Sequence, residues 1–380
     1  MFVPREIAPS ILASSQEYPV ICVTGPRQSG KTTLCKALFP EKPYCSLENP
    51  TTLLRVSSDP EGFLSGLPSG AVVDEAQRFP PLLSYLQGMV DAEGVPGRFV
   101  LTGSSNLLLM EKVSQTLAGR CALFTLLPFS LEEAVELRSP GEVFSAILSG
   151  GYPRLLSQKL RRGAFFANYI ATYVERDVRQ LLNIKDTLQF SRFLKLLAGR
   201  IGSLLDYTSL ANDCGISVPT VREWLSILEA SYICFQLPPW HENRGKRLVK
   251  STKLYFYDTG IACALLQIGT TEQLLRDPLR GGLFENLMIV EKLKAGLNRG
   301  ERPELYFYRD SNGVEVDLVE HREGCLLPTE IKSSMTFHPD FCRSLQTFAE
   351  RYSDICGRPT VQYAGSEAFT FKGCEIRGFP

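Results

Sequence analysis

The hydrophobic pattern of the first third of the chain alternates between short apolar runs and polar, amphipathic stretches. The amphipathic stretches Lys31–Phe39 and Pro81–Asp91 predict helices. The apolar runs predict strands at Val20–Thr24, Pro43–Leu47, Ala71–Asp74, Arg98–Thr102 and Cys121–Leu126. Nearly continuous apolar strands separated by helices are typical of a parallel sheet covered on both faces, so the pattern predicts an α/β fold.

The rest of the chain changes character twice. From about residue 130 to 205 the pattern is helical and rich in charge, as in Phe165–Leu182. Residues 208–258 predict helix, turn, helix and two strands, and Gly281-Gly282 marks a boundary. The last hundred residues predict a helix at Leu283–Leu297, strands near 304–309, 313–320 and 326–332, a helix near 339–352 and a final strand at 359–363. We therefore expect four parts, at residues 1–155, 156–205, 206–280 and 281–380.

Composition narrows the classes of function. Lys and Arg number 41, as do Asp and Glu, so no global field draws the chain to nucleic acid or membrane. The eleven cysteines include no closely spaced pair, and the three histidines are far apart, which argues against a zinc site. No apolar run reaches the roughly 20 residues of a membrane span, and the N-terminus lacks an apolar signal core. We expect a cytoplasmic protein with no membrane partner.

A phosphate-binding motif follows the first predicted strand. Its residues are Gly25, Pro26, Arg27, Gln28, Ser29, Gly30, Lys31 and Thr32, with Thr33 next in the following helix. This G-x-x-x-x-G-K-T pattern between a strand and a helix predicts a P-loop whose backbone N–H groups surround phosphates. Lys31 is expected to reach the β- and γ-phosphates of ATP, and the Thr32 hydroxyl to ligate Mg²⁺.

Acidic and hydroxyl side chains end two other predicted strands. Asp74 and Glu75 follow a buried strand, where Asp74 would be compensated by the magnesium shell and Glu75 would orient or deprotonate water. Thr102 or Ser104 could sense the γ-phosphate, or could cap a turn. Arg120 could stabilise transferred phosphoryl charge, in its own chain or a neighbouring copy, or be a solvated surface residue.

These motifs resemble one group of AAA+-type ATPases, in which an N-terminal ATPase domain precedes a C-terminal domain of unknown function. The resemblance rests on GPRQSGKT, VVDEAQ, LTGSSN, LAGR and GGYP, and continues through TYVERDV, KSTKLYFYDTG, GGLFENL, GVEVDLV and TEIKSS. It therefore spans most of the chain. It implies an AAA+-like sheet in which the strand ending at Thr102 lies between the P-loop strand and the strand ending at Asp74.

A helix-turn-helix signature lies in the middle of the chain. Thr208–Cys214 and Val218–Ala230 predict two helices, separated by Gly215 and with Ser217 as a cap. Strands at Ile233–Leu237 and Lys253–Tyr257 would form a winged-helix hairpin with a basic loop. The candidate DNA-contacting residues are Thr220, Arg222, Lys246 and Arg247. The alternative is a packing module, since the exposed face of the second helix also carries acids.

Acids and a lysine alternate with apolar residues near the C-terminus. Strand period predicts that Glu315 and Asp317 share one face, and that Glu330 and Lys332 share another. If the strands are adjacent, Asp317, Glu330 and Lys332 converge, and Glu285 could add a carboxylate. This arrangement resembles the PD-(D/E)xK nuclease superfamily without its leading proline, which implies a restriction-endonuclease-like α/β domain using Mg²⁺. The alternative is a degenerate fold without cleavage.

Two functions fit these features. The first is an ATP- and Mg²⁺-dependent AAA+-type ATPase coupled to DNA binding or processing. The second is a nucleotide-driven switch that regulates protein assembly, with an inactive nuclease-like domain. Either could act as a homo-oligomer. In both, Lys31, Glu75 and Arg120 are the candidate catalytic residues.

Overall fold

The structure, a computed structural model, describes residues 3–104, 115–139, 141–178, 186–242 and 251–379. The chain divides into two compact units. The first contains residues up to Phe129 together with Ala230–Tyr232 and Gly296–Glu301, and the second contains the remainder. Each unit has its own clusters of buried apolar side chains. The expected four-part division stays a prediction.

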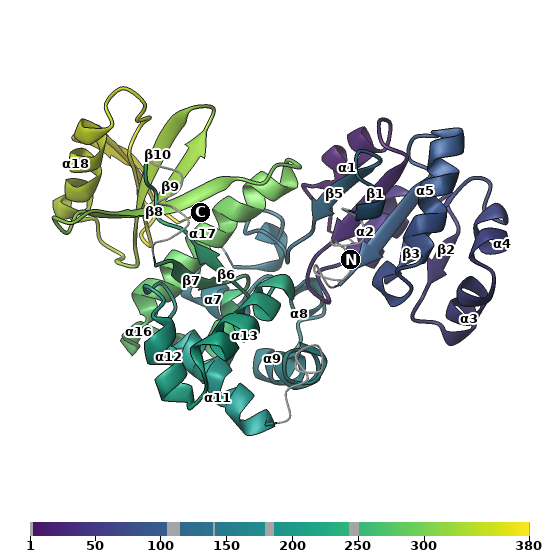
Figure 1. Cartoon of the computed structure of the whole chain (residues 1–380). Coiled ribbons are helices and arrows are strands. Elements are labelled where there is room, and N and C mark those ends of the chain that lie inside the picture. The colour runs from purple at the N-terminus through teal and green to yellow at the C-terminus, as the bar shows by residue number, and fades with distance from the viewer. Residues whose placement is uncertain (1–2, 105–114, 140, 179–185, 243–250, 380) are drawn as a thin grey trace. The chain divides into compact units, whose positions relative to one another are not determined.

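A five-stranded parallel sheet forms the centre of the first unit (Figure 1). Its strands are β1 (Val20–Thr24), β2 (Tyr44–Ser46), β3 (Ala71–Asp74), β4 (Phe99–Gly103) and β5 (Cys121–Thr125). Their order is β2-β3-β4-β1-β5. This confirms the α/β class and the expected place of β4 between the P-loop strand and the acidic strand.

The two faces of this sheet are buried by different helices. Val20 and Cys22 of β1 pack into one cluster, and Ile21 and Val23 into the other, as strand alternation requires. The helices on the first face are α3 (Pro50–Ser58), α4 (Pro60–Ser65) and α5 (Leu82–Glu93), and those on the second are α1 (Ala8–Ser14) and α2 (Lys31–Leu38). A 3-10 turn, η1 (Ala76–Arg78), follows β3.

Helices α1, α3 and α4 were not predicted from the sequence. Yet α3 and α4 each begin with a cap followed by proline. Asn49 accepts the Thr51 N–H at 2.9 Å, and Asp59 accepts the Gly62 N–H at 2.8 Å. An Asx residue before proline is a helix-start signal, so these two helices could have been found.

The second unit begins with short helices. They are η2 (Val135–Leu137), α7 (Val143–Ser149), α8 (Pro153–Ser157), α9 (Arg162–Tyr169), the π-helical η3 (Ile170–Val178), α11 (Thr187–Ala198), α12 (Tyr207–Cys214) and α13 (Val218–Ala230). The helical pattern over Phe165–Leu182 corresponds to α9 and η3, whose hydrogen bonding changes from α to π at Ile170; residues 179–182 lie outside the described residues. The antiparallel hairpin of β6 (Cys234–Leu237) and β7 (Lys253–Phe256) follows, then α15 (Thr259–Leu265) and α16 (Thr271–Arg276).

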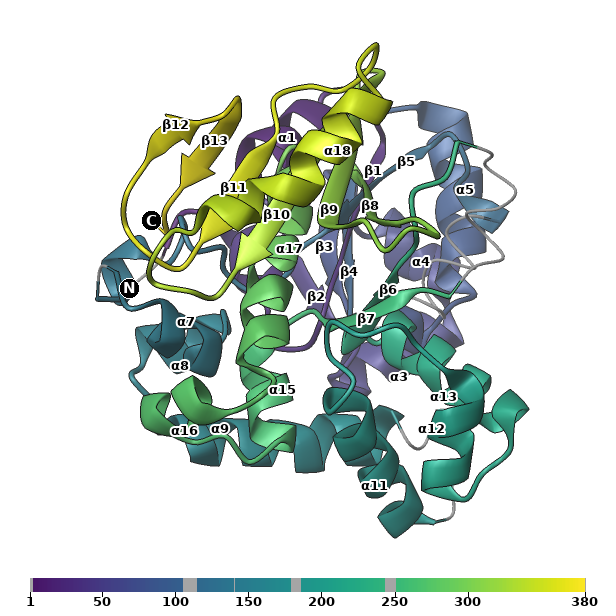
Figure 2. The ribbon, with the colours of Figure 1, turned by 90° about the vertical axis from the view of Figure 1, so that its left-hand side faces the viewer.

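A six-stranded mixed sheet completes the second unit (Figure 2). After α17 (Arg280–Asn298) come β8 (Glu304–Arg309), β9 (Glu315–Arg322), β10 (Cys325–Lys332), η4 (Pro339–Cys342), α18 (Arg343–Arg351), β11 (Thr360–Tyr363), β12 (Phe369–Phe371) and β13 (Cys374–Arg377). The order is β12-β13-β11-β10-β9-β8, with α18 packed on β9 and β10. The expectation that β11 ends the fold is wrong, because two more strands extend the sheet.

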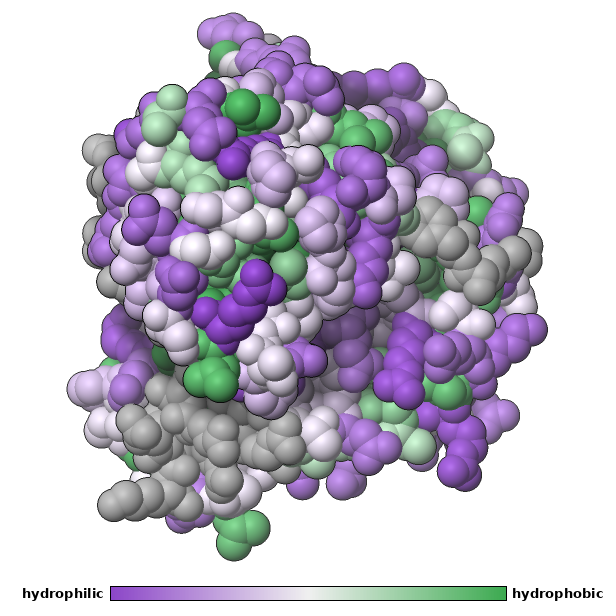
Figure 3. All heavy atoms as spheres, turned by 90° about the vertical axis from the view of Figure 1, so that its right-hand side faces the viewer, coloured by the Kyte–Doolittle hydropathy of each residue, from purple (hydrophilic) through white to green (hydrophobic). Residues whose placement is uncertain are grey.

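Two observations bear on the possible partners of the protein. No helix among the described residues is long and apolar enough to cross a membrane. On the face of the molecule in Figure 3, hydrophilic residues predominate and apolar residues are scattered among them. Scattered apolar residues are ordinary on protein surfaces.

Candidate functional site

The P-loop joins β1 to α2 through glycines that no other residue could replace. Gly25 has φ of 144°, and a Cβ there would lie 2.1 Å from the Leu126 carbonyl oxygen. Gly30 caps α2 in the left-handed conformation, with φ of 96°. The loop therefore has a glycine-dependent backbone directly before the N-terminus of α2, which is the kind of turn that binds phosphates.

Lys31 is held inside this loop. Its side chain is 6% exposed, and Nζ donates to the carbonyl oxygens of Gly25 at 2.9 Å and Pro26 at 2.8 Å. Burial lowers the pKa of Lys31 to about 8, although the charges of Glu75 and Asp74 oppose this. A buried ammonium that rests on neutral carbonyl groups is suited to an incoming anion.

Asp74 gathers three hydroxyl groups at the end of β3. Thr32 Oγ1 lies 3.1 Å from Asp74 Oδ2, Tyr44 Oη donates to the same oxygen at 2.5 Å, and Thr102 Oγ1 donates to Oδ1. Thr32 and Asp74, the two predicted magnesium ligands, are therefore adjacent. Tyr44 was missed by sequence reasoning, since it reaches Asp74 only because β2 pairs with β3.

Glu75 is fixed in an unusual backbone conformation. Its φ of 57° places it in the left-handed region, which is rare for a non-glycine residue and common at functional sites. Its Oε2 accepts from Ser104 Oγ at 3.1 Å and from Gln77 Nε2 at 2.5 Å. The two candidate sensor residues are thus divided: Thr102 contacts Asp74, and Ser104 contacts Glu75.

The other predicted nucleotide-site residues have different surroundings. Ser29 is fully buried, and its carbonyl oxygen accepts from Arg5 Nη1 at 2.9 Å. Gln28 has φ of 63°, Arg27 is half-buried and Thr33 is exposed. Arg5 was not predicted from the sequence. It also donates to the Leu127 carbonyl at 2.8 Å, so it links the P-loop to Leu127 from a position outside the motif.

Arg120 lies on the surface of the first unit. Its guanidinium pairs with Asp91 through Nε and through Nη2, the latter at 2.9 Å from Oδ2. Both side chains are partly exposed, at 34% and 44%. In the structure Arg120 forms a surface ion pair. Its role in stabilising transferred phosphoryl charge stays a prediction.

The four nuclease-like residues come together in the second unit. Lys332 Nζ lies 3.1 Å from Asp317 Oδ2 and 2.6 Å from Glu330 Oε1. Glu285 on α17 lies near enough to be affected by the charge of Asp317, and it contacts Lys253, whose Nζ lies 3.1 Å from Glu285 Oε1. Burial and the charge of Asp317 raise the pKa of Glu285 to about 7 and that of Glu330 to about 8. We call Glu285, Glu315, Asp317, Glu330, Lys253 and Lys332 the acid cluster.

The pairing of β8 with β9 contains an irregularity next to Asp317. From Tyr306 to Tyr308, β8 advances two residues, while the paired β9 advances three, from Val319 to Val316. Such a bulge re-aims side chains. Asp317 lies beyond the last β9–β10 pair, Leu318 with Thr329, and its Oδ2 accepts the Ile331 N–H at 2.8 Å. Because of the bulge, Val316 and Val319 both pack into one core although they lie three residues apart.

The helix-turn-helix signature forms α12 and α13 with Gly215 between them at φ of 71°. Ser217 Oγ accepts the Thr220 N–H at 3.2 Å, as the predicted cap requires. Arg222 lies 4.1 Å from the centre of the Tyr207 ring. Lys246 and Arg247 lie outside the described residues. Trp240 follows β6 and is buried against Tyr306, with ring centres 5.3 Å apart.

Three family models match consecutive parts of the chain. Residues 17–135 match a model described as an AAA domain. Residues 141–272 and 280–378 match two models, each described as a domain of unknown function (DUF8612 and DUF4143). The AAA match covers the P-loop, Asp74, Glu75 and the strand order found above, and it supports an AAA-type ATPase.

Two curated relatives cover most of the chain. They are Uncharacterized protein Rv2008c of Mycobacterium tuberculosis and Uncharacterized protein Mb2031c of Mycobacterium bovis. Each is 33% identical over 347 residues, which is 90% of this chain and 76% of the relative. The chain belongs to the same family as these two proteins. Among solved structures, this AAA-domain protein is similar to the Walker-type ATPase PABY2304 of Pyrococcus abyssi, at 17% identity and a TM-score of 0.45, covering 68% of this chain and 94% of that one.

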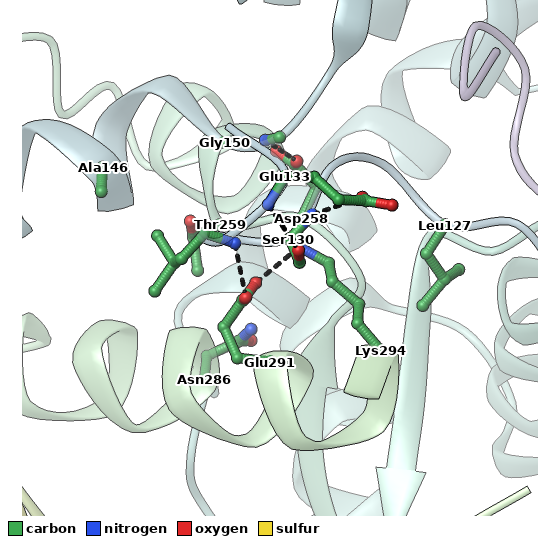
Figure 4. A network of polar contacts seen from close by, with 12 residues as sticks. Leu127, Ser130, Glu133, Ala146, Gly150, Asp258, Thr259, Asn286, Glu291 and Lys294 are labelled. Atoms are coloured by element: carbon green, nitrogen blue, oxygen red, sulfur yellow. Dashed lines mark hydrogen bonds and ion pairs between the residues drawn. The ribbon is translucent and has the colours of Figure 1, made fainter. Parts of the chain in front are cut away.

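Two of the motifs quoted for the family resemblance hold the second unit together (Figure 4). Asp258, 4% exposed, accepts the N–H groups of Gly151 at 2.7 Å and Gly260 at 2.9 Å. A Cβ on Gly150 would lie 2.1 Å from Asp258 Oδ1. Asn286 of α17 bonds both the N–H and the carbonyl of Phe256. GGYP and YDTG in this AAA-domain protein therefore serve packing between its segments.

Proposed function

We propose that this protein hydrolyses ATP with Mg²⁺ at the P-loop. The main supporting observation is that the buried Lys31 ammonium donates to two loop carbonyls. The Thr32 and Asp74 side chains lie next to each other. The loop N–H groups and Lys31 would bind the phosphates, and Thr32 and Asp74 would hold the metal. Bound magnesium would neutralise charge on the β- and γ-phosphates. The residues present fit both groups, because the P-loop lysine lies at the loop beside the N-terminus of α2 and the two oxygen ligands are neighbours.

Glu75 supplies the proposed general base. Its carboxylate lies one residue beyond the metal ligand Asp74 and is held by Ser104 and Gln77. A carboxylate fixed in this way can orient a water molecule for in-line attack on the γ-phosphate and accept its proton. Thr102 and Ser104 each contact one of the two acids, which supports their proposed role as sensors that respond to the nucleotide.

Substitution of Lys31 tests the proposed reaction. Lys31→Ala should lower Mg²⁺-dependent phosphate release by roughly 10²–10³-fold, because the γ-phosphate loses its counter-charge. The matched control is Lys195→Ala, an exposed lysine of α11, which should turn over ATP at the wild-type rate. Wild-type turnover by Lys31→Ala would remove the proposed site.

The proposed output of the nucleotide cycle is contact with DNA through α12 and α13. The supporting observation is the capped second helix after a left-handed Gly215, a helix-turn-helix geometry. Arg222→Glu should weaken binding to duplex DNA and flatten its salt dependence, whereas Lys195→Glu should have a smaller effect. Equal binding by wild-type and Arg222→Glu protein at low salt would exclude α13 from DNA contact.

A second candidate output is regulation of a protein assembly, with a C-terminal domain that does not cleave DNA. The observation favouring it is that Glu285, Asp317 and Glu330 each contact a lysine. Incubation of supercoiled DNA with wild-type and Asp317→Ala protein, with Mg²⁺ and ATP, separates the two outputs. Nicking that is lost in Asp317→Ala supports processing, and intact DNA with both proteins supports the switch.

A further inference from the structure

A lysine from outside the C-terminal sheet reaches into the acid cluster. Lys253 lies on β7 of the hairpin and is 4% exposed. Its Nζ is 3.1 Å from Glu285 Oε1 and 2.7 Å from Glu315 Oε1. Burial alone would lower the pKa of Lys253, but the charges of Glu285, Asp317 and Glu315 outweigh it and raise the pKa. The ammonium is therefore charged and fully engaged.

Donors of this chain engage one oxygen of each of the Glu285, Asp317 and Glu330 carboxylates, while Glu330 Oε2 is buried without a hydrogen-bond partner, so the cluster is not arranged as the metal centre that the nuclease resemblance implies. Asp317 Oδ2 accepts from the Ile331 N–H and from Lys332, and Glu330 Oε1 contacts Lys332. Glu285 Oε1 contacts Lys253 and the Tyr255 hydroxyl. Among the described residues, no group of three or more His, Cys, Asp or Glu side chains is arranged to hold a metal ion.

The same hairpin is joined to the C-terminal sheet at a second place. After β6 the chain runs along β8, where the Phe307 N–H donates to the Pro238 carbonyl at 3.1 Å and the Trp240 N–H donates to the Phe307 carbonyl. Trp240 packs into the core that lies under α18. Lys253 therefore lies on a hairpin that is also hydrogen-bonded to this sheet through the residues after its first strand, β6.

We infer that the Lys253 ammonium is the resident counter-cation of Glu285 and Glu315 in the acid cluster, in place of a divalent ion, and that it locks the β6–β7 hairpin onto the C-terminal sheet. Four carboxylates, of Glu285, Glu315, Asp317 and Glu330, surround two ammonium groups, of Lys253 and Lys332. Buried carboxylates require such compensation. A covalently attached cation supplies it without a metal and without dissociation. The inference is independent of ATP turnover at the P-loop.

Removal of the Lys253 charge should open a cation site. The experiment measures the melting temperature of the full chain without nucleotide, with and without 5 mM Mn²⁺ (about 100 times a ~50 μM Kd). Wild-type protein should shift by less than about 1 °C. Lys253→Met should melt lower by on the order of 10 °C, because two acids lose their partner, and Mn²⁺ should restore about 5 °C of this. Glu315→Gln added to Lys253→Met should abolish the restoration, because Glu315 is one of the two acids that Lys253 contacts.

Lys294→Met is the matched control. Lys294 is 5% exposed on α17 and lies 2.7 Å from Glu291, outside the cluster. Its removal should lower the melting temperature with no restoration by Mn²⁺. Absence of any Mn²⁺ effect on Lys253→Met would overturn the inference. So would Mn²⁺ stabilisation of wild-type protein that disappears in the single variant Asp317→Asn, a comparison that remains available if Lys253→Met does not fold.

Discussion

The P-loop and the acid cluster both place lysines near acidic side chains, but the ammonium groups contact different partners. Lys31 donates to two backbone carbonyls, and burial lowers its pKa to about 8. Lys253 and Lys332 contact carboxylates, whose charges outweigh burial and raise the pKa of both lysines. The first arrangement leaves positive charge undercompensated and suits an anionic ligand, whereas in the second each lysine is paired with two carboxylates of the same chain.

The most direct test of this difference between the two sites is to replace one lysine of each by methionine, which is neutral and of similar length. Lys332→Met should cost on the order of 2–3 kcal/mol of unfolding free energy, since Asp317 and Glu330 lose their shared partner while the site stays partly open to water. Lys31→Met should leave stability unchanged or raise it, because a desolvated charge is removed. Urea unfolding of both variants without nucleotide measures the difference. Equal losses would contradict the proposed distinction.

Glu75→Gln separates the chemistry of the P-loop from its affinity. The amide cannot accept a proton, so turnover should fall by roughly 10²–10⁴-fold while ATP still binds. Measurement of steady-state phosphate release beside equilibrium binding of ATP tests both parts. Gln77→Glu is not a useful control, because Gln77 contacts Glu75. Gln87→Glu on α5 is the control, since it exchanges an amide for a carboxylate, the reverse change, elsewhere in the unit. Undiminished turnover by Glu75→Gln would assign the base to another residue.

Tyr44→Phe tests whether the hydroxyl on Asp74 positions this residue for the metal. One hydrogen bond to a charged group is lost, so turnover at limiting Mg²⁺ should fall by about tenfold, with recovery at high Mg²⁺. Tyr85→Phe is the matched control, because Tyr85 is an exposed tyrosine of α5. A fall in turnover that high Mg²⁺ does not reverse would show that Tyr44 does not act through metal binding.

The lowered pKa of Lys31 predicts a pH dependence of ATP binding. The free protein loses the Lys31 proton as the pH rises through about 8, and a bound triphosphate would restore it. Affinity should therefore be full below pH 8 and fall above it, by up to about tenfold per pH unit. Calorimetry between pH 7 and 9.5 in two buffers of different ionisation enthalpy measures the affinity and the proton taken up. Lys31→Arg should show neither change.

The sequence predicted those features that depend on neighbouring residues. Strand β1, the P-loop, β3 and helix α13 begin and end as their local patterns indicate, because apolar runs, glycines and the Ser217 cap act over a few residues. Strands β12 and β13 were missed, since they are short and have only small apolar faces.

Contacts between distant segments could not be predicted in the same way. Tyr44 meets Asp74 through strand pairing, and Lys253 meets Glu285 through hairpin docking, 30 and 32 residues apart. A lysine in KSTKLYFYDTG carries no local sign of its partner. The convergence of Asp317, Glu330 and Lys332 was predictable because two adjacent strands carry them, but the bulge in β9 and the lysine from β7 were not.

The smallest expected effect concerns Arg120. Because this residue forms a partly exposed ion pair with Asp91, Arg120→Ala should leave the urea midpoint of unfolding close to that of wild type. If the pair is the only role of Arg120, turnover should also stay within about twofold of wild type, and Asp91→Ala should behave identically. Turnover that falls by more than about a hundredfold in Arg120→Ala alone would instead assign it to the phosphoryl group. Mixing that variant with Lys31→Ala protein then separates the two arrangements: recovered activity requires that Arg120 acts on a neighbouring copy, because only there can one chain supply the arginine and another the intact P-loop.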